Sequence, residues 1–122
     1  MGTRRAAFVY SDALSQHVLS DSHPMKPERL RYTHELLQAY GAFEPDNALL
    51  VAPRPATDAE IGSYHTPEYI DAVRTYGRGE VPKNAHLYNF GPGDNPAYDG
   101  VFDASALSTG ASVVAAEMLM TG

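Results

Sequence analysis

The sequence predicts an α/β fold with a parallel sheet. Two short unbroken apolar runs, AAFVY at residues 6–10 and ALLVA at residues 48–52, are typical of strands that are buried on both faces. The segment between them carries apolar residues at helical spacing. A strand, a helix and a second strand in this order favour a right-handed crossover and a parallel strand pair with helices packed against it.

The helix between the strands has a start and a stop in the sequence. Pro27 suits the first turn of a helix, and Glu28 complements the positive end of the helix dipole. Leu30 and Leu37 follow at helical spacing, and Gly41 is a typical residue at which a helix ends.

Two more helices are expected after the second strand. The stretch TDAE at residues 57–60 matches a capping box and predicts a short helical turn that Gly62 ends. Thr66 can cap a second helix, and Pro67 can occupy its first turn. An apolar side then continues up to Gly77, which predicts a longer helix.

The last third of the chain combines a long loop with an apolar helix. Residues 79–100 contain four glycines and three prolines, and a loop of this length in a compact domain is more often functional than idle. Residues 101–120 have no Lys or Arg and only two acids, Asp103 and Glu117. We expect a helix that is buried on most sides rather than a membrane span. Because the other elements cannot surround it, the chain is expected to be the N-terminal part of a larger domain, or to borrow cover from another chain.

Composition argues against several classes of function. The net charge of -6 leaves no basic face for nucleic acid. There is no cysteine, so disulfides, thiolate metal sites and cysteine nucleophiles are excluded. The apolar run near the start is too short for a signal segment or a membrane span, which favours the cytoplasm.

The histidines do not form a recognised metal motif. His34-Glu35 begins like the H-E-x-x-H zinc helix, but Gln38 stands where the second histidine would be, so a core or surface role for His34 is favoured. A site built from local histidines remains a minor alternative, and its stoichiometric zinc would be detectable. The remaining histidines are His17, His23, His65 and His86.

Two charged residues have a functional and an architectural interpretation. Asp94, on a loop tip rich in Gly and Pro, could accept hydrogen bonds from the amides of a bound peptide, or could cap its own loop. Arg29 lies in a first helical turn, where a cation is unfavourable. It could hold a small anion through a bidentate contact, or pair with Glu28 or Glu35 on the surface.

Three stretches, in this order, resemble a known family. They are SHPMKPERLRYTHELLQAYG, YHTPEYIDAV and FGPGDNPAYDGVFDASALSTGASVVAA. Together they resemble the N-terminal part of the zinc-dependent histone deacetylase superfamily, most closely its prokaryotic acetoin-utilization branch. The resemblance extends from residue 6 to about residue 120.

The resemblance implies a three-layer α/β/α arginase-like fold with a parallel sheet, of which residues 1–122 would be an incomplete, N-terminal fragment of one deacetylase domain. It implies hydrolysis of an acetyl-amide, from acetyl-lysine or an acetylated small amine, by a full-length parent that contains zinc. The family's zinc ligands, histidine pair and catalytic tyrosine come later in its pattern. The fragment is therefore expected to bind no metal and to be inactive alone.

A few site residues follow from the resemblance. Asp94 matches the rim aspartate that accepts hydrogen bonds from substrate amides, and Arg29 matches the arginine of the acetate channel, near which Tyr10 is also expected. The loop beside the pocket is matched by His23, Pro24 and Met25.

A different class of function stays open. The chain could be a non-catalytic interaction module that forms a homo-oligomer to cover its apolar C-terminal helix. A stable, soluble monomer would argue against that hypothesis.

Overall fold

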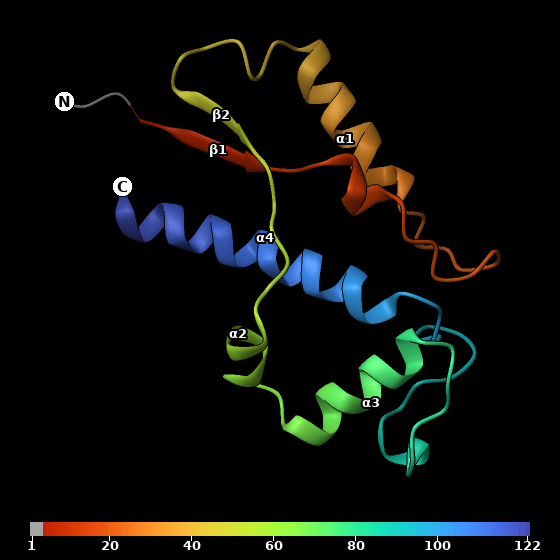
Figure 1. Ribbon diagram of the computed structural model, residues 1–122. Helices are drawn as coiled ribbons and strands as arrows, with labels where there is room; N and C mark the ends of the chain where they lie inside the picture. Colours follow the sequence, from red (N-terminus) through yellow and green to blue (C-terminus); the bar gives the residue numbers. More distant parts are fainter. Residues whose placement is uncertain (1–3) are drawn as a thin grey trace.

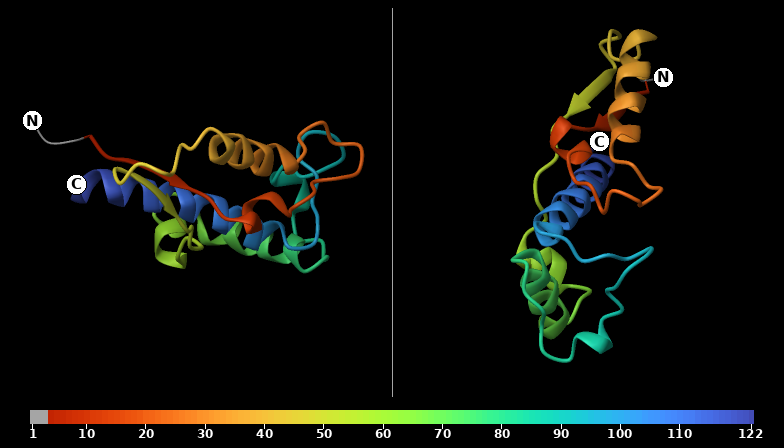
Figure 2. Two further views of the ribbon diagram at one scale, coloured as in Figure 1. Left: turned by 90° about the horizontal axis from the view of Figure 1, so that it is seen from above. Right: turned by 90° about the vertical axis from the view of Figure 1, so that its right-hand side faces the viewer.

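The computed structural model describes residues 4–122, which form a two-stranded sheet, four α-helices and two 3₁₀ turns (Figure 1). In chain order the elements are β1 (Ala6–Val9), η1 (Asp12–Ser15), α1 (Glu28–Ala39), β2 (Ala48–Val51), α2 (Asp58–Gly62), α3 (Pro67–Gly77), η2 (Ala85–Leu87) and α4 (Val101–Thr121). Helix α4 crosses the middle of the molecule, with the sheet and α1 on one side and α2 and α3 on the other (Figures 1 and 2).

The strand pair is parallel, as the strand-helix-strand order predicts. The register pairs Ala6 with Ala48 and Val9 with Val51. Phe8 of β1 and Tyr10, which directly follows β1, stack on the His34 ring of α1. The centroid of the His34 ring is 6.5 Å from that of Phe8 and 4.5 Å from that of Tyr10. Helix α4 also contacts β1. The predicted α/β class with a parallel sheet is confirmed.

The expectation that both strands are buried on both faces is wrong for this chain. No residue of β1 or β2 is fully buried, and Leu50 is 49% exposed. The sheet has two strands within residues 4–122, so each strand has one unpaired edge and the helices cover the sheet only in part.

The local helix signals are confirmed. Helix α1 begins directly after Pro27 and is followed by Gly41, which adopts φ +70°. The Gly41 N–H donates to the Gln38 carbonyl at 2.9 Å, and the Ala42 N–H donates to the Leu37 carbonyl at 3.0 Å. A left-handed glycine that satisfies the last carbonyls of a helix in this way ends the helix at low conformational cost.

Both predicted caps are present at α2 and α3. The Thr57 N–H donates to Glu60 Oε2 at 2.7 Å, and the Glu60 N–H donates to Thr57 Oγ1 at 3.2 Å, which completes the capping box. Thr66 Oγ1 accepts a hydrogen bond from the Tyr69 N–H at 3.3 Å, and Pro67 is the first residue of α3.

A small core joins α3 to the start of α4. Val73, Tyr76 and Val101 are buried together, and loop residues Phe90 and Tyr98 pack against them. The rings of Tyr76 and Phe90 lie 4.6 Å apart. The long loop between α3 and α4 is therefore held on this core by its aromatic side chains.

The segment that follows β2 crosses α4 at very short range. The Ala56 N–H donates to the Ala106 carbonyl of α4 at 2.8 Å. A Cβ atom at Gly110 would lie 1.7 Å from the Arg54 carbonyl oxygen, so only glycine fits at this crossing. Arg54 also pairs with Glu60 at 2.8 Å and with Glu117 of α4 at 3.0 Å.

Helix α4 is less covered than its composition predicts. Its buried residues, Val101, Ala104, Ala106 and Gly110, all belong to its first half. Leu119 and Met120, near its end, are each 86% exposed. The expectation of burial on most sides is wrong for the second half of the helix, in which no residue is buried. Among the residues that the structure describes, no helix has the length and apolar character needed to cross a membrane.

Candidate functional site

Two loops that are distant in the sequence meet at His23 and Asp94. His23 is 7% exposed, and it is the one buried polar or charged residue among residues 4–122. Its Nδ1 accepts a hydrogen bond from the Met25 N–H at 3.0 Å, and its Nε2 lies 3.2 Å from the Asp94 carbonyl oxygen. Because Nδ1 is an acceptor, the ring proton of neutral His23 belongs on Nε2, which then donates to Asp94.

The loop around Asp94 is closed by its neighbours. The Gly91 N–H donates to the Asn95 carbonyl at 2.9 Å, and Asn95 Nδ2 donates to the Asn89 carbonyl at 3.0 Å. Gly93 adopts φ +104°, a conformation that favours glycine. Asp94 is exposed, and within residues 4–122 its carboxylate makes no hydrogen bond. The carboxylate therefore does not cap this loop, and it is open to an external donor.

A cavity of about 350 Å³ lies behind this meeting point, between η1, the start of α1 and α4. Arg29 and Met25 line it, and both residues are exposed. Pro24 is also exposed, but it does not line the cavity. The cavity also has a polar wall that includes His17, Tyr98, Ser105 and Thr109.

Arg29 brings an available positive charge to this cavity. Among the described residues its guanidinium has no hydrogen bond and no ion pair, whereas the neighbouring Arg31 pairs with Glu35 at 3.2 Å. The surface pairing of Arg29 with Glu35 that the sequence left open is therefore taken by Arg31. A guanidinium at the edge of a small polar cavity suits a carboxylate ligand, which it can bind through two parallel hydrogen bonds.

Tyr10 is buried outside the cavity. Its ring stacks on His34 at 4.5 Å, and its hydroxyl donates to Asp12 Oδ1 at 3.1 Å and lies 3.2 Å from Ser15 Oγ. These contacts hold η1, whose Leu14 lines the cavity. Tyr10 does not line the cavity, but it holds η1, which does. His34 packs between β1 and α1.

Several cavity residues had no strong signal in the sequence. Burial raises the pKa of the Tyr98 hydroxyl, so the phenol stays neutral and can donate a hydrogen bond near pH 7. Ser105, Ser108 and Thr109 also line the cavity, and their spacing of three and four residues places them on one face of α4. That hydroxyl stripe in an apolar helix is the signal that could have found them.

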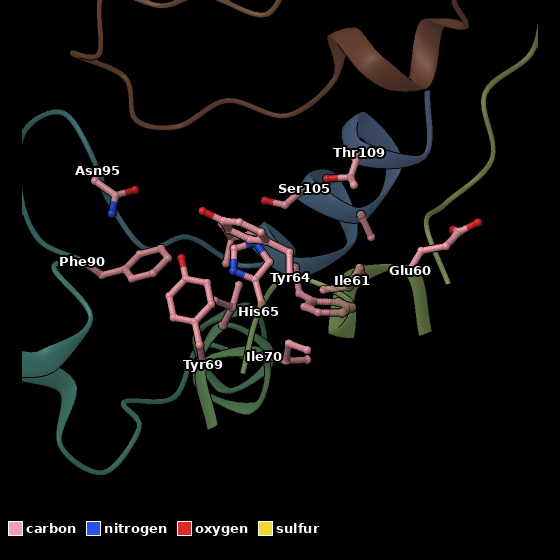
Figure 3. A pocket seen from close by; sticks show the side chains of 14 residues that line it. Glu60, Ile61, Tyr64, His65, Tyr69, Ile70, Phe90, Asn95, Ser105 and Thr109 are labelled. Atoms are coloured by element: carbon pink, nitrogen blue, oxygen red, sulfur yellow. The ribbon is translucent and has the colours of Figure 1, made fainter. Parts of the chain in front are cut away.

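A second cavity of about 450 Å³ lies on the other side of α4, against α2 and α3 (Figure 3). Part of its wall is aromatic, where the His65 ring lies 4.9 Å from the Tyr64 ring and 5.0 Å from the Tyr69 ring. Ser105 and Thr109 line this cavity as well as the first. None of the residues that the sequence singled out for the substrate or for acetate lines it.

The side chains described do not fit a metal ion. Within residues 4–122, no three His, Asp or Glu side chains gather closely enough to hold one. His17 and His65 line different cavities, and His34 is packed among aromatic rings. A metal site made of the local histidines therefore has no support in the part of the chain that is described.

Comparisons with known proteins identify relatives over most of the chain. Residues 23–122 match the family model described as the histone deacetylase domain. The chain is 32% identical to the acetoin utilization protein AcuC of Bacillus subtilis (strain 168) over 120 residues, and 36% identical to histone deacetylase 1 of Homo sapiens over 122 residues. These matches cover 98% and 97% of the chain, but only 30% and 25% of the two relatives.

Solved structures agree with the sequence matches. A crystal structure of a histone deacetylase homologue from Aquifex aeolicus superimposes with a TM-score of 0.84 at 29% identity, and the HD domain of HDA15 superimposes with 0.74 at 27% identity. Each likeness covers 98% of this chain, but 32% and 33% of those two chains respectively. The predicted family and fold are confirmed.

Proposed function

Because the chain belongs to the histone deacetylase family, we propose that it forms the N-terminal part of a domain that hydrolyses acetyl-amides. The proposed substrate is acetyl-lysine or an acetylated small amine, and the proposed location is the cytoplasm. The net charge of -6 makes nucleic acid a poor partner. The sheet supports the proposal that the domain is incomplete, since its two strands are only half covered.

One observation carries the proposal. The hydrogen bond between His23 and Asp94 joins two loops that are 71 residues apart in sequence, and each loop belongs to a stretch that resembles the family. Next to this contact lies the cavity that Arg29 and Met25 line. His23 and Asp94 are thus joined directly, and Arg29 shares a cavity with Met25, two residues after His23, whereas Tyr10 lies outside that cavity.

Asp94 is proposed to hold the substrate. Its carboxylate is exposed at a loop tip whose main chain is fixed, and it lacks a partner within residues 4–122. A carboxylate in this state can accept hydrogen bonds from the backbone amides that flank an acetylated lysine. Such charge-assisted bonds orient the substrate without taking part in bond cleavage.

Arg29 is proposed to bind the acetate product. Its unpaired guanidinium lies at the edge of a cavity with hydroxyl groups from Tyr98 and α4, which can share the hydrogen bonds of a small carboxylate. Tyr10 supports this wall by holding η1 through Asp12 and Ser15.

The zinc ion that the family resemblance implies does not fit the residues described at 4–122. No suitable ligand group occurs within residues 4–122, so its ligands would have to come from elsewhere in the proposed parent. Pro24 and Met25 are proposed to border the substrate entrance beside His23. No chemical step is assigned to the residues of this chain, and we propose that the chain is inactive alone.

An assay on an acetyl-lysine peptide tests this proposal. The 122-residue chain and a longer protein that continues it past Gly122 are compared with zinc and with a chelator. We expect zinc-dependent release of acetate from the longer protein only. Turnover by the short chain would overturn its proposed inactivity, and a zinc-loaded longer protein without turnover would overturn the proposed reaction.

A second candidate function is supported by the exposed end of α4. Leu119 and Met120 present apolar side chains to solvent, and a second copy of the chain could cover them in a non-catalytic oligomer. Size-exclusion chromatography with light scattering measures the mass. A concentration-dependent dimer that Leu119→Ser and Met120→Ser abolish supports the oligomer, and a stable monomer contradicts it.

A further inference from the structure

The two loops are hydrogen-bonded to each other through the side chain of His23. Within residues 4–122, the bond from His23 Nε2 to the Asp94 carbonyl is the one hydrogen bond between the loop at 20–27 and the loop at 89–99. It is formed by a side chain that is 7% exposed, so water does not compete with it freely.

The ring of His23 is itself held in place. Its Nδ1 accepts from the Met25 N–H at 3.0 Å, and the main-chain N–H of His23 donates to the Ser20 carbonyl at 3.1 Å. Lys26 Nζ donates to the Asp21 carbonyl at 2.7 Å, which closes the same loop. Both ring nitrogens are therefore used, in one tautomer, with each nitrogen serving a different loop.

The bond reaches the main chain of Asp94 and leaves its carboxylate free. Because the local loop is already closed by Gly91 and Asn95, a hydrogen bond to the Asp94 carbonyl restrains the main chain from which the carboxylate projects. We infer that His23 is a positioning residue, which presents the Asp94 carboxylate to substrate by anchoring the Asp94 carbonyl in its Nε2–H tautomer. This inference rests on the proposed role of Asp94 as a substrate-binding residue.

Two substitutions separate the two halves of the His23 contact. The amide oxygen of asparagine can replace Nδ1 and still accept from the Met25 N–H, but asparagine is too short to reach the Asp94 carbonyl. The amide nitrogen of glutamine can replace Nε2 and donate to that carbonyl, while its acceptor no longer lies beside Met25. His23→Asn and His23→Gln are thus matched variants with opposite predicted defects.

Amide hydrogen exchange of the 122-residue chain measures the effect of each variant on the two hydrogen bonds of the His23 ring. In His23→Asn, the Gly91 amide, which closes the Asp94 loop, is expected to exchange about tenfold faster, because one hydrogen bond of ordinary strength is lost. The Met25 amide is expected to keep its exchange rate. In His23→Gln, the Met25 amide is expected to speed up and the Gly91 amide to keep its rate. The amides of Ala72 and Val73 in α3 report whether the fold is intact.

The result that overturns the inference is equally specific. An unchanged exchange rate of the Gly91 amide in His23→Asn would mean that His23 does not anchor the Asp94 loop. The tautomer gives an independent check on the unaltered chain, since a long-range nitrogen-proton correlation spectrum should show the proton on Nε2. A proton on Nδ1 would contradict the assignment even if both variants failed to fold.

Steady-state kinetics of a longer, active protein test the role of His23 separately from the proposed role of Asp94. We expect His23→Asn to raise KM for an acetyl-lysine peptide with little change in kcat, and His23→Gln to restore KM. If Asp94→Ala leaves KM unchanged, the proposed role of Asp94 fails, while the exchange rates still decide whether His23 anchors its loop.

Discussion

The two sides of α4 differ in how completely they are packed. On one side, α3, the start of α4 and the 79–100 loop enclose a core of Val73, Tyr76 and Val101. On the other side, no residue of α1, β1 or β2 is buried. The closed side is built from neighbouring parts of the chain, whereas a parallel sheet needs further strands to cover it. The loop with Asp94 is therefore packed on the side of α4 that contains this buried core.

The first test compares a large side chain of the closed core with a large side chain at the exposed end of α4. Tyr76→Ala is expected to lower the free energy of unfolding by about 3–5 kcal/mol, because it leaves a cavity in the closed core. Leu119→Ala should change it by less than about 0.5 kcal/mol, because that side chain is 86% exposed. Urea denaturation measures both. Similar losses in the two variants would show that the end of α4 is covered in solution.

The second test concerns the crossing that joins the two sides. Gly110→Ala is expected to cost about 3 kcal/mol or more, because the new Cβ would meet the backbone at Arg54 and Ala56. Gly62→Ala is the matched control, since nothing lies within 4 Å of its new Cβ. Thermal unfolding should separate the two variants clearly. An unchanged melting temperature in Gly110→Ala would place the connecting segment farther from α4.

The third test uses pH on the same crossing. Hydrogen bonds from Arg54 and from the Thr57 N–H lower the pKa of Glu60 from its ordinary 4.5 to about 2. The charged form is favoured in the folded chain, so its contribution is present above pH 4.5 and is lost as the pH falls toward 2. Glu60→Gln should flatten this part of the stability profile. Parallel profiles for both proteins would contradict the lowered pKa.

The smallest expected effect is on the open side. Arg31→Ala removes the exposed pair with Glu35 in α1, and it should cost less than about 1 kcal/mol. The loss should disappear at high salt, which screens exposed charges. Urea denaturation at low and high salt checks this, and a large loss that salt does not reduce would show that Arg31 has another partner.

Local sequence signals predicted the helices well, but they could not predict contacts between residues that are distant in the sequence. The capping box at Thr57, the cap at Thr66 and the stop at Gly41 depend on three or four adjacent residues, so the sequence contains them fully. The bond from His23 to Asp94 joins residues 71 positions apart, and no periodicity encodes it. The resemblance to a family brought both residues to attention without their contact.

Burial was the least predictable property. Helix α4 is apolar nearly all round, so its pattern does not say which face is covered, and its exposed end could not be foreseen. The predicted burial of the two strands was wrong for a similar reason. An unbroken apolar run indicates which residues are buried in a complete sheet, and this sheet has two strands within residues 4–122. Arg29 was found by its unfavourable place in the first turn of α1, whereas the hydroxyl groups near it were not.

The most direct test of the central claim is the effect of Asp94 on substrate binding. Steady-state kinetics are measured on an acetyl-lysine peptide with the longer protein that continues this chain, with and without Asp94→Ala. The account predicts that kcat/KM falls by about tenfold to a hundredfold through a higher KM, the effect of losing charge-assisted hydrogen bonds. An unchanged KM would contradict the claim that this chain provides the substrate-binding rim of a deacetylase.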